Sequence, residues 1–505
     1  MEKDNAGIKG TERRLYDRML KYAGVFGGVQ GVVMLVSVVL AKVKSLLLGP
    51  AGFGITENLN RTTDIVKNAT NLGIQTVAVP KISVFADNDK AGLSDRITVT
   101  RSWALLAAIA GMVICFILAP VLGRWAFNGD TGYTVDFMLL SLSVAAASVT
   151  GGEIAVLRGG KHLRNLALSQ LFASILSLCI SVPLFRFFRL DGIVPALVLS
   201  AVGTMAVTCF YSFRLYPYKS RPFSPAVLRK GLDMIGFGVL LTIVAFLGAW
   251  AWSIIARFLM GKGGAELTGT YSAGYMLVTY FTALLLYVTD SEYYPRLAAA
   301  GQDIESAHRM MNSQAQAMIM ISAPLIICFI ILMPLVVYIV LEYGKFQGSI
   351  TVAQFAVVGV LFKSVSVPVA YLVLAKSDSV IYIIQETLCN ILLIICVIAG
   401  YNHLGLIGLG ISFAVWELLY LGIVLFLSGI RYSFRLSRDV VICFLIQTVL
   451  AVTVSFLSLS DKKALLILSL ILLAASCAYS FFFFRKHTTF MSGLENRIRR
   501  LFSHR

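Results

Sequence analysis

Stretches of roughly 20 apolar residues recur along the whole of this 505-residue chain. A stretch of that length is what an α-helix needs to cross the hydrocarbon core of a bilayer. Lipid offers no partners to backbone N–H and C=O groups, so a spanning segment must be a helix or a strand of a closed barrel. The runs lack the alternation that is typical of barrel strands. The sequence therefore predicts an all-α polytopic membrane protein.

The composition agrees with this class. Hydrophobic residues make up 58% of the chain and charged residues 14%, and the mean hydropathy is +0.82. A net charge of +17 would suggest nucleic-acid binding in a soluble protein. Here the basic residues lie in short loops between the apolar runs, where they set the topology of a membrane protein. We therefore expect membrane lipids, and no nucleic acid, as partners.

The apolar runs predict about 14 transmembrane helices. With the N-terminus on the cytoplasmic side, 30 of the 43 Lys and Arg residues fall at cytoplasmic helix ends, and this bias predicts that both termini are cytoplasmic. The predicted helices are 22–47, 61–83, 102–126, 135–158, 165–188, 192–213, 233–258, 268–293, 314–341, 351–375, 379–400, 405–429, 438–458 and 463–484.

An internal repeat divides these helices into two sets of six. The motif "LLLGPAGFGIT" is similar to "FLMGKGGAELT", which places Gly49 opposite Gly261 at an offset of 212. Further along, "VPKI" matches "YPRL", and "ICFILAP" matches "ICFIILMP", in the same order and at nearly the same offset. A repeat of six helices keeps its orientation in the membrane, so the halves are related by an axis along the membrane normal.

The repeat predicts the domain organisation. Two parallel six-helix lobes that face each other are typical of an alternating-access transporter, with the substrate site between them. The predicted domains are a cytoplasmic N-terminal segment (1–21), an N-lobe with helices 1–6 (22–220), a C-lobe with helices 7–12 (221–432), two accessory helices (433–484) and a cytoplasmic basic tail (485–505).

The second predicted helix, within "ENLNRTTDIVKNATNLGIQTVAVPKIS", is unusually polar. Its polar residues are spaced so that they share one helical face. A charge inside the membrane costs several kcal/mol when it meets lipid. The face therefore predicts a water-filled cavity, and the alternative is a solvated outer loop. The residues on or beside this face are Arg61, Asp64, Lys67, Asn68, Asn71 and Gln75.

Further charges lie within or at the ends of predicted helices. Lys44 either faces the cavity or reaches the outer headgroups, as Lys42 also could. Lys363 either faces the cavity or forms an ion pair with Glu386 or Glu417. Together with Arg257 these cations predict a cavity that attracts an anionic substrate, either a phosphate or a carboxylate.

Signatures of enzymes and metal sites are missing from the sequence. The five His residues form no metal-binding motif, and no nucleotide-binding loop or nucleophile elbow is present. We therefore expect no catalytic residues, no metal and no cofactor.

The run "AKVKSLLLGPAGFGITENLNRTTDIVKNATNLGIQTVAVPKIS" resembles the N-terminal signature of Wzx-type flippases of the multidrug/oligosaccharidyl-lipid/polysaccharide (MOP) exporter superfamily. The "LLGPAGFG" turn followed by "NLGI" carries most of the resemblance, and the two extra helices are a departure from many members. The resemblance implies a flippase that moves an undecaprenyl-diphosphate-linked oligosaccharide, such as an O-antigen unit, from the cytoplasmic to the periplasmic leaflet of the bacterial inner membrane. A polysaccharide polymerase and a chain-length regulator are its implied partners.

On that hypothesis the polar residues have three roles. Asn68, Asn71 and Gln75 suit sugar hydroxyls. Asp64, Glu386 and Glu417 are candidates for coupling to H⁺ or Na⁺. The cations expected to bind the headgroup are Lys44, Arg61, Lys67, Arg257 and Lys363.

Two other functions stay open. A multidrug exporter of the MATE type belongs to the same superfamily, but it would favour an acidic, aromatic cavity for cationic drugs. A membrane enzyme of polysaccharide assembly would need a catalytic residue on an outer loop, such as Asp130 or Glu266.

Overall fold

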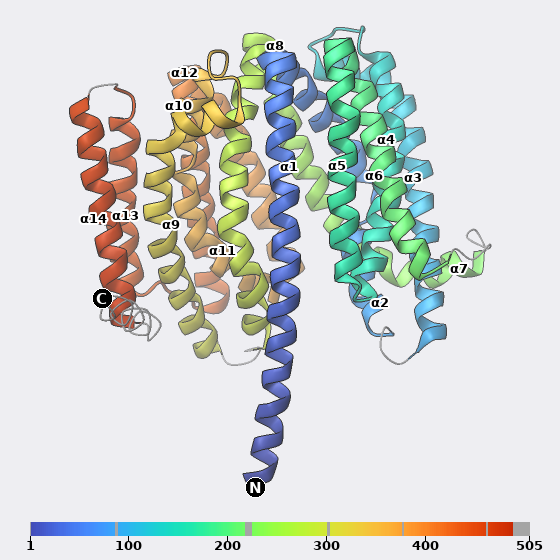
Figure 1. Cartoon of the computed structure of the whole chain (residues 1–505), viewed down its shortest axis with the longest axis horizontal. Helices are drawn as coiled ribbons and strands as arrows, with labels where there is room; N and C mark the ends of the chain where they lie inside the picture. Colours follow the sequence, from blue (N-terminus) through green and yellow to red (C-terminus); the bar gives the residue numbers. More distant parts are fainter. Residues whose placement is uncertain are drawn as a thin grey trace, which may run out of the picture. The chain divides into compact units, whose positions relative to one another are not determined.

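The computed structural model describes residues 2–85, 89–217, 225–299, 304–375, 378–460 and 463–487 (Figure 1). All regular structure in these ranges is helical, which confirms the predicted fold class, while the number of spans and the side of each terminus stay predictions. The elements are α1 (Glu2–Thr70), α2 (Ile74–Ser83), α3 (Lys90–Ala126), α4 (Thr134–Gly159), α5 (Leu163–Phe188), the 3-10 helix η1 (Arg189–Gly192), α6 (Ile193–Leu215), α7 (Pro225–Lys230), α8 (Leu232–Ala299), α9 (Ile304–Val340), α10 (Gln347–Ala356), α11 (Gly359–Ala375), α12 (Ser379–Tyr432), α13 (Arg438–Leu457) and α14 (Lys463–His487).

Many of these helices can cross a membrane. Among the described residues, nine helical segments are long and apolar enough, or ten if the bent pair Gln347–Ala356 and Gly359–Val373 forms one span. Two of the segments, Leu163–Leu215 and Val380–Tyr432, are 53 residues long, whereas one crossing takes about 20. The chain is a multi-pass membrane protein.

Several of the long helices are broken by residues with positive φ. Gly49 in α1 has φ 65° and ψ −170°, and Gly264 in α8 has φ 64° and ψ −160°. This region of the backbone map is open essentially to glycine alone. Arg189, between α5 and α6, and Gly405 in α12 form a second pair, with φ of 50° and 58°. The helices are thus interrupted at corresponding places in the two repeats.

The breaks refine the register of the repeat. The sequence comparison places Gly49 opposite Gly261, but the backbone conformation pairs it with Gly264, 215 residues later. Pro80 and Pro295, from the second matched motif, are also 215 residues apart. The structure therefore gives the first two motifs one common offset.

Just beyond these breaks, α1 and α8 cross with almost no space between their backbones. A Cβ atom on Gly54 would overlap the carbonyl oxygen of Ala265, and a Cβ atom on Gly269 would overlap the carbonyl oxygen of Pro50. Gly54 and Gly269, like Pro50 and Ala265, are 215 residues apart. The contact is therefore reciprocal, and only glycine fits at either crossing position.

The polar second helix of the sequence prediction is interrupted. α1 ends at Thr70, Leu72 and Gly73 have φ of 50° and 59°, and α2 begins at Ile74. A Cβ atom on Gly73 would lie 2.9 Å from the carbonyl oxygen of Gly238. The expectation of one continuous helix over 61–83 is therefore wrong, because this turn needs left-handed backbone and close contact with α8.

By its contacts the chain divides into two compact units. The first contains Met1–Gly269 and Val340–Glu342, and the second contains Thr270–Ile339 and Tyr343–Arg505. The lobe boundaries drawn from the repeat stay a prediction, and residues 488–505 of the predicted basic tail lie outside the described residues.

In the first unit, α3, α4, α5 and α6 run side by side (Figure 1). Their core includes the fully buried Phe137, Leu140 and Val144. In the second unit, α13 and α14 form an antiparallel pair (Figure 1). Gln447 of α13 accepts a hydrogen bond from Ser476 at 2.7 Å and donates one to Ser480 at 3.3 Å. Such polar contacts hold helices together where lipid supplies no hydrophobic driving force.

Candidate functional site

Arg61 and Arg257 lie at a junction of α1, α3 and α8 in the first unit. The Arg61 guanidinium lies 4.8 Å from the ring centre of Trp252, and the Arg257 guanidinium lies 4.1 Å from that of Trp125. Ser253 joins the helices, because its hydroxyl accepts a hydrogen bond from Trp125 Nε1 at 3.2 Å. Stacking on indole rings holds both guanidinium groups in place without neutralising their charge.

Lys44 and Glu57 extend this junction along α1. Glu57 Oε1 accepts a hydrogen bond from Arg61 Nε at 2.7 Å, one helical turn away. The Lys44 ammonium lies 4.0 Å from the ring centre of Phe53 and within the electrostatic reach of Glu57. Lys42, in contrast, donates a hydrogen bond to the Leu341 carbonyl at 2.6 Å. The junction thus contains three cations, on Lys44, Arg61 and Arg257, and the Glu57 carboxylate is paired with Arg61.

Asp64, Lys67 and Asn68 lie on the next turns of α1. Lys67 Nζ and Asp64 Oδ1 form an ion pair at 3.1 Å, with 27% and 38% of the two side chains exposed. Asn68 is half-buried. Because Asp64 is already paired with a cation, any ion that it binds must compete with Lys67.

Asn71 and Gln75 flank the turn that separates α1 from α2. Among the described residues, nothing donates a hydrogen bond to the buried Oδ1 atom of Asn71. Gln75 lines an open cavity of about 310 Å³ in the first unit. The remaining lining residues come from α4 and α6: Ala147, Thr150, Gly151, Ile154, Ser200, Ala201 and Thr204.

The three predicted residues of the second unit form a separate cluster. Lys363 Nζ of α11 is 3.1 Å from Glu417 Oε1 of α12, and Glu417 is almost fully buried. Glu386 accepts a hydrogen bond from the Tyr420 hydroxyl at 3.3 Å, and Gln385 donates one to the same hydroxyl at 2.8 Å. Of the two ion pairs left open by the sequence, Lys363–Glu417 is the one that forms directly.

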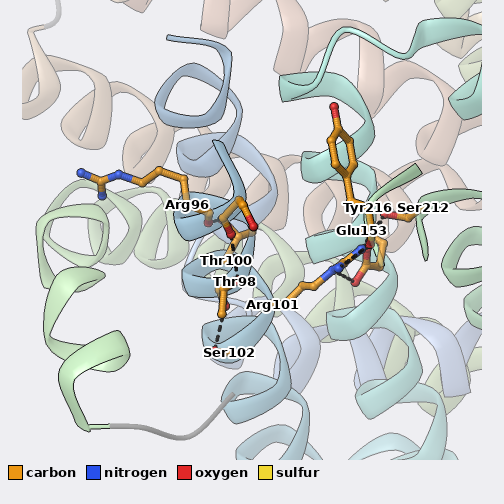
Figure 2. Close-up of polar contacts among 9 residues, drawn as sticks. Arg96, Thr98, Thr100, Arg101, Ser102, Glu153, Ser212 and Tyr216 are labelled. Carbon is orange, nitrogen blue, oxygen red and sulfur yellow. Dashed lines mark hydrogen bonds and ion pairs between the residues drawn. The ribbon is translucent and has the colours of Figure 1, made fainter. Parts of the chain in front are cut away.

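A buried network at α3, α4 and α6 was missed from the sequence (Figure 2). Arg101 Nε donates to Glu153 Oε1 at 2.9 Å, and Arg101 Nη2 donates to Glu153 Oε2 at 3.0 Å. The same guanidinium donates to the carbonyl of Tyr216 at 2.9 Å and to the hydroxyl of Ser212 at 3.1 Å. Glu153 lies inside a predicted transmembrane helix, and a carboxylate within the membrane needs a cationic partner. That requirement was the signal in the sequence that pointed to this network.

Solved structures show which known fold the chain has. An inward-facing multidrug resistance MATE family transporter of the MOP superfamily superposes with a TM-score of 0.62 at 15% identity, covering 81% of this chain and 98% of that one. The lipid II flippase MurJ in an inward closed conformation superposes with a TM-score of 0.66 at 11% identity, covering 92% and 99%. At these identities the likeness concerns the fold, which is that of MOP-superfamily membrane transporters and flippases.

A comparison of the sequence with family models shows the family of this protein. Residues 43–346, more than half of the chain, match the family model described as polysaccharide biosynthesis protein. The chain belongs to this polysaccharide biosynthesis protein family. No curated protein matches the sequence. Family and fold together confirm the resemblance to polysaccharide flippases of the MOP superfamily.

Proposed function

We propose that this protein is a flippase that moves an undecaprenyl-diphosphate-linked oligosaccharide from the cytoplasmic to the periplasmic leaflet of the bacterial inner membrane. The observation that carries the proposal is the junction with three cations, on Lys44, Arg61 and Arg257, of which Arg61 is paired with the Glu57 carboxylate. The family match supports a substrate from polysaccharide biosynthesis, and the fold supports alternating access as the mechanism.

The chemistry of the junction suits a diphosphate. A guanidinium presents several donors in one plane and binds two oxygens of a phosphate at once, whereas an ammonium acts as a compact point charge. Arg61 donates through Nε to Glu57, and an arriving diphosphate would compete with that carboxylate for the same cation. The aromatic rings beneath Arg61 and Arg257 keep both side chains oriented while the anion exchanges.

The other predicted residues have assigned roles in this proposal. Lys67 and Lys363 add positive charge, and Asn68, Asn71 and Gln75 bind the glycan. Asp64, Glu386 and Glu417 are the candidates for coupling to H⁺ or Na⁺, and each now has a partner that the ion must replace: Lys67, Tyr420 and Lys363. We further propose that the protein has no catalytic activity, needs no cofactor and works beside a polysaccharide polymerase and a chain-length regulator.

The experiment compares cells that lack the gene with cells that carry it. Lipid-linked oligosaccharides are extracted, and their leaflet is determined by access of a membrane-impermeant glycan label in right-side-out and inverted vesicles. We expect undecaprenyl-linked units to accumulate on the cytoplasmic face of the deletion strain and to clear when the gene is restored. If the lipid-linked pool is unchanged and the cells instead become sensitive to cationic drugs, the protein is a multidrug exporter and the proposal is wrong.

A further inference from the structure

The cavity beside Gln75 differs from the cationic junction in its chemistry. All eight of its lining residues are uncharged. Ala147, Ile154 and Ala201 give it an apolar wall, and the hydroxyls of Thr150, Ser200 and Thr204 add polar atoms. Neither a diphosphate nor a cationic drug suits such a wall, because a buried ion without a partner is strongly disfavoured.

Two carboxamides converge on one glycine at this cavity. A Cβ atom on Gly151 would lie 3.7 Å from Asn71 Oδ1 and 3.7 Å from Gln75 Oε1. Of the two, Gln75 lines the cavity, so its carboxamide is the one that can exchange hydrogen bonds with a ligand there.

The hydroxyls of the wall are arranged to accept hydrogen bonds. Thr150 donates its own proton to the Ala146 carbonyl at 2.7 Å, and Thr204 donates to the Ser200 carbonyl at 2.8 Å. Their oxygens therefore keep lone pairs for a ligand that carries O–H or N–H groups. A ligand that suits this cavity is neutral, rich in donors, and apolar on the side that meets Ala147, Ile154 and Ala201.

The size limits the ligand further. A volume of about 310 Å³ lies at the small end of the range for small-molecule pockets, about 300–1,000 Å³, and is far larger than the ~30 Å³ that one water occupies. We propose that this cavity is a subsite for a single neutral sugar ring of the lipid-linked glycan. The inference rests on the proposed function and deepens it by separating a glycan subsite on α2, α4 and α6 from the headgroup site on α1 and α8.

Gly151→Ala tests the proposal. The added methyl group makes only ordinary van der Waals contacts, yet it fills the point between the two carboxamides. Alanine also favours a helix over glycine, so the variant should fold. Gly422→Ala is the matched control, because this helical glycine of α12 has no atom within 4 Å of its would-be Cβ among the described residues.

Binding is measured by native mass spectrometry with two probes. One is the lipid-linked oligosaccharide pool extracted from the deletion strain, and the other is undecaprenyl diphosphate without sugar. We expect Gly151→Ala to weaken binding of the glycan-bearing lipid about 10-fold and to leave undecaprenyl diphosphate unaffected, while Gly422→Ala changes neither.

The outcomes separate the two proposals. If the wild-type protein binds both probes and Gly151→Ala retains its full affinity for the glycan-bearing lipid, the cavity holds solvent alone and the subsite is wrong. Equal loss of both probes in a folded Gly151→Ala protein also overturns the subsite. If the wild-type protein binds neither probe, the flippase proposal itself fails.

Discussion

Arg101 and Glu153 hold each other by two parallel hydrogen bonds, from Nε to Oε1 at 2.9 Å and from Nη2 to Oε2 at 3.0 Å, with only 6% and 4% of their side chains exposed. Removing one partner of such a buried pair leaves an uncompensated charge, whereas replacing both by apolar groups is often tolerated. This asymmetry gives the network a clear signature in mutagenesis.

We expect Arg101→Met and Glu153→Leu each to lower the free energy of unfolding by about 3–5 kcal/mol. The double variant should regain most of that loss. Thermal unfolding of the detergent-solubilised variants measures this cycle. A double variant that is as unstable as the sum of the single variants would show that the two side chains do not act as a pair.

The pair of Lys363 and Glu417 can be tested with the same single and double substitutions, and flipping activity is measured beside stability. The second measurement is needed because 29% of the Lys363 side chain is exposed while Glu417 is 1% exposed. We expect Lys363→Met to destabilise the protein by leaving the Glu417 carboxylate buried alone. Lys363→Met combined with Glu417→Leu should restore stability but not flipping of lipid-linked oligosaccharide in proteoliposomes. Recovery of wild-type flipping in the double variant would reduce Lys363 to a structural partner of Glu417.

Arg61 should contribute directly to headgroup affinity. Hydrogen bonds to charged groups contribute roughly 1.5–3 kcal/mol, so Arg61→Gln should weaken binding of undecaprenyl diphosphate about 10-fold or more. Arg309→Gln is the matched control, since Arg309 pairs with Glu305 at the same helical spacing but is mostly exposed. Equal affinities for Arg61→Gln and Arg309→Gln would remove Arg61 from the headgroup site.

A substitution at Gly264 measures the free-energy cost of the backbone break separately from side-chain clashes. Among the described residues nothing lies within 4 Å of its would-be Cβ, and its φ is 64°. Gly264→Ala should therefore destabilise the protein by about 1–3 kcal/mol through backbone strain alone. Gly31→Ala, which has equally open surroundings and no positive φ, should be neutral or stabilising, and unfolding temperatures compare the two. Equal stability of both variants would contradict the strain.

The sequence was sufficient for the fold class because apolar length and charge bias act locally along the chain. The superfamily also followed from one contiguous motif. The register of the repeat could not be predicted, because the sequence match aligned Gly49 with Gly261, which lies close to Gly264 in the sequence. Only the φ values distinguish these two glycines. The break in the polar helix between Arg61 and Gln75 could not be predicted for a related reason. The turn at Leu72 and Gly73 depends on contact with α8, which is distant in the sequence.

Charge pairing was the least predictable part of the site. Arg101 and Glu153 are 52 residues apart, and the partner of a lone charge depends on which helices pack together. Lys363 had two possible partners at suitable positions, Glu386 and Glu417, and the packing of α11 against α12 decided between them. The stacking of Arg61 on Trp252 has no local signal at all in the sequence.

The crossing of α1 and α8 is reciprocal between the two repeats. Gly54 meets Ala265, and Gly269 meets Pro50, so each repeat offers the other the same patch. In a symmetric assembly this is an isologous interface, the kind that joins two identical subunits about a twofold axis. Here both copies of the patch belong to one chain, so the contact has the geometry of a homodimer interface within a monomer.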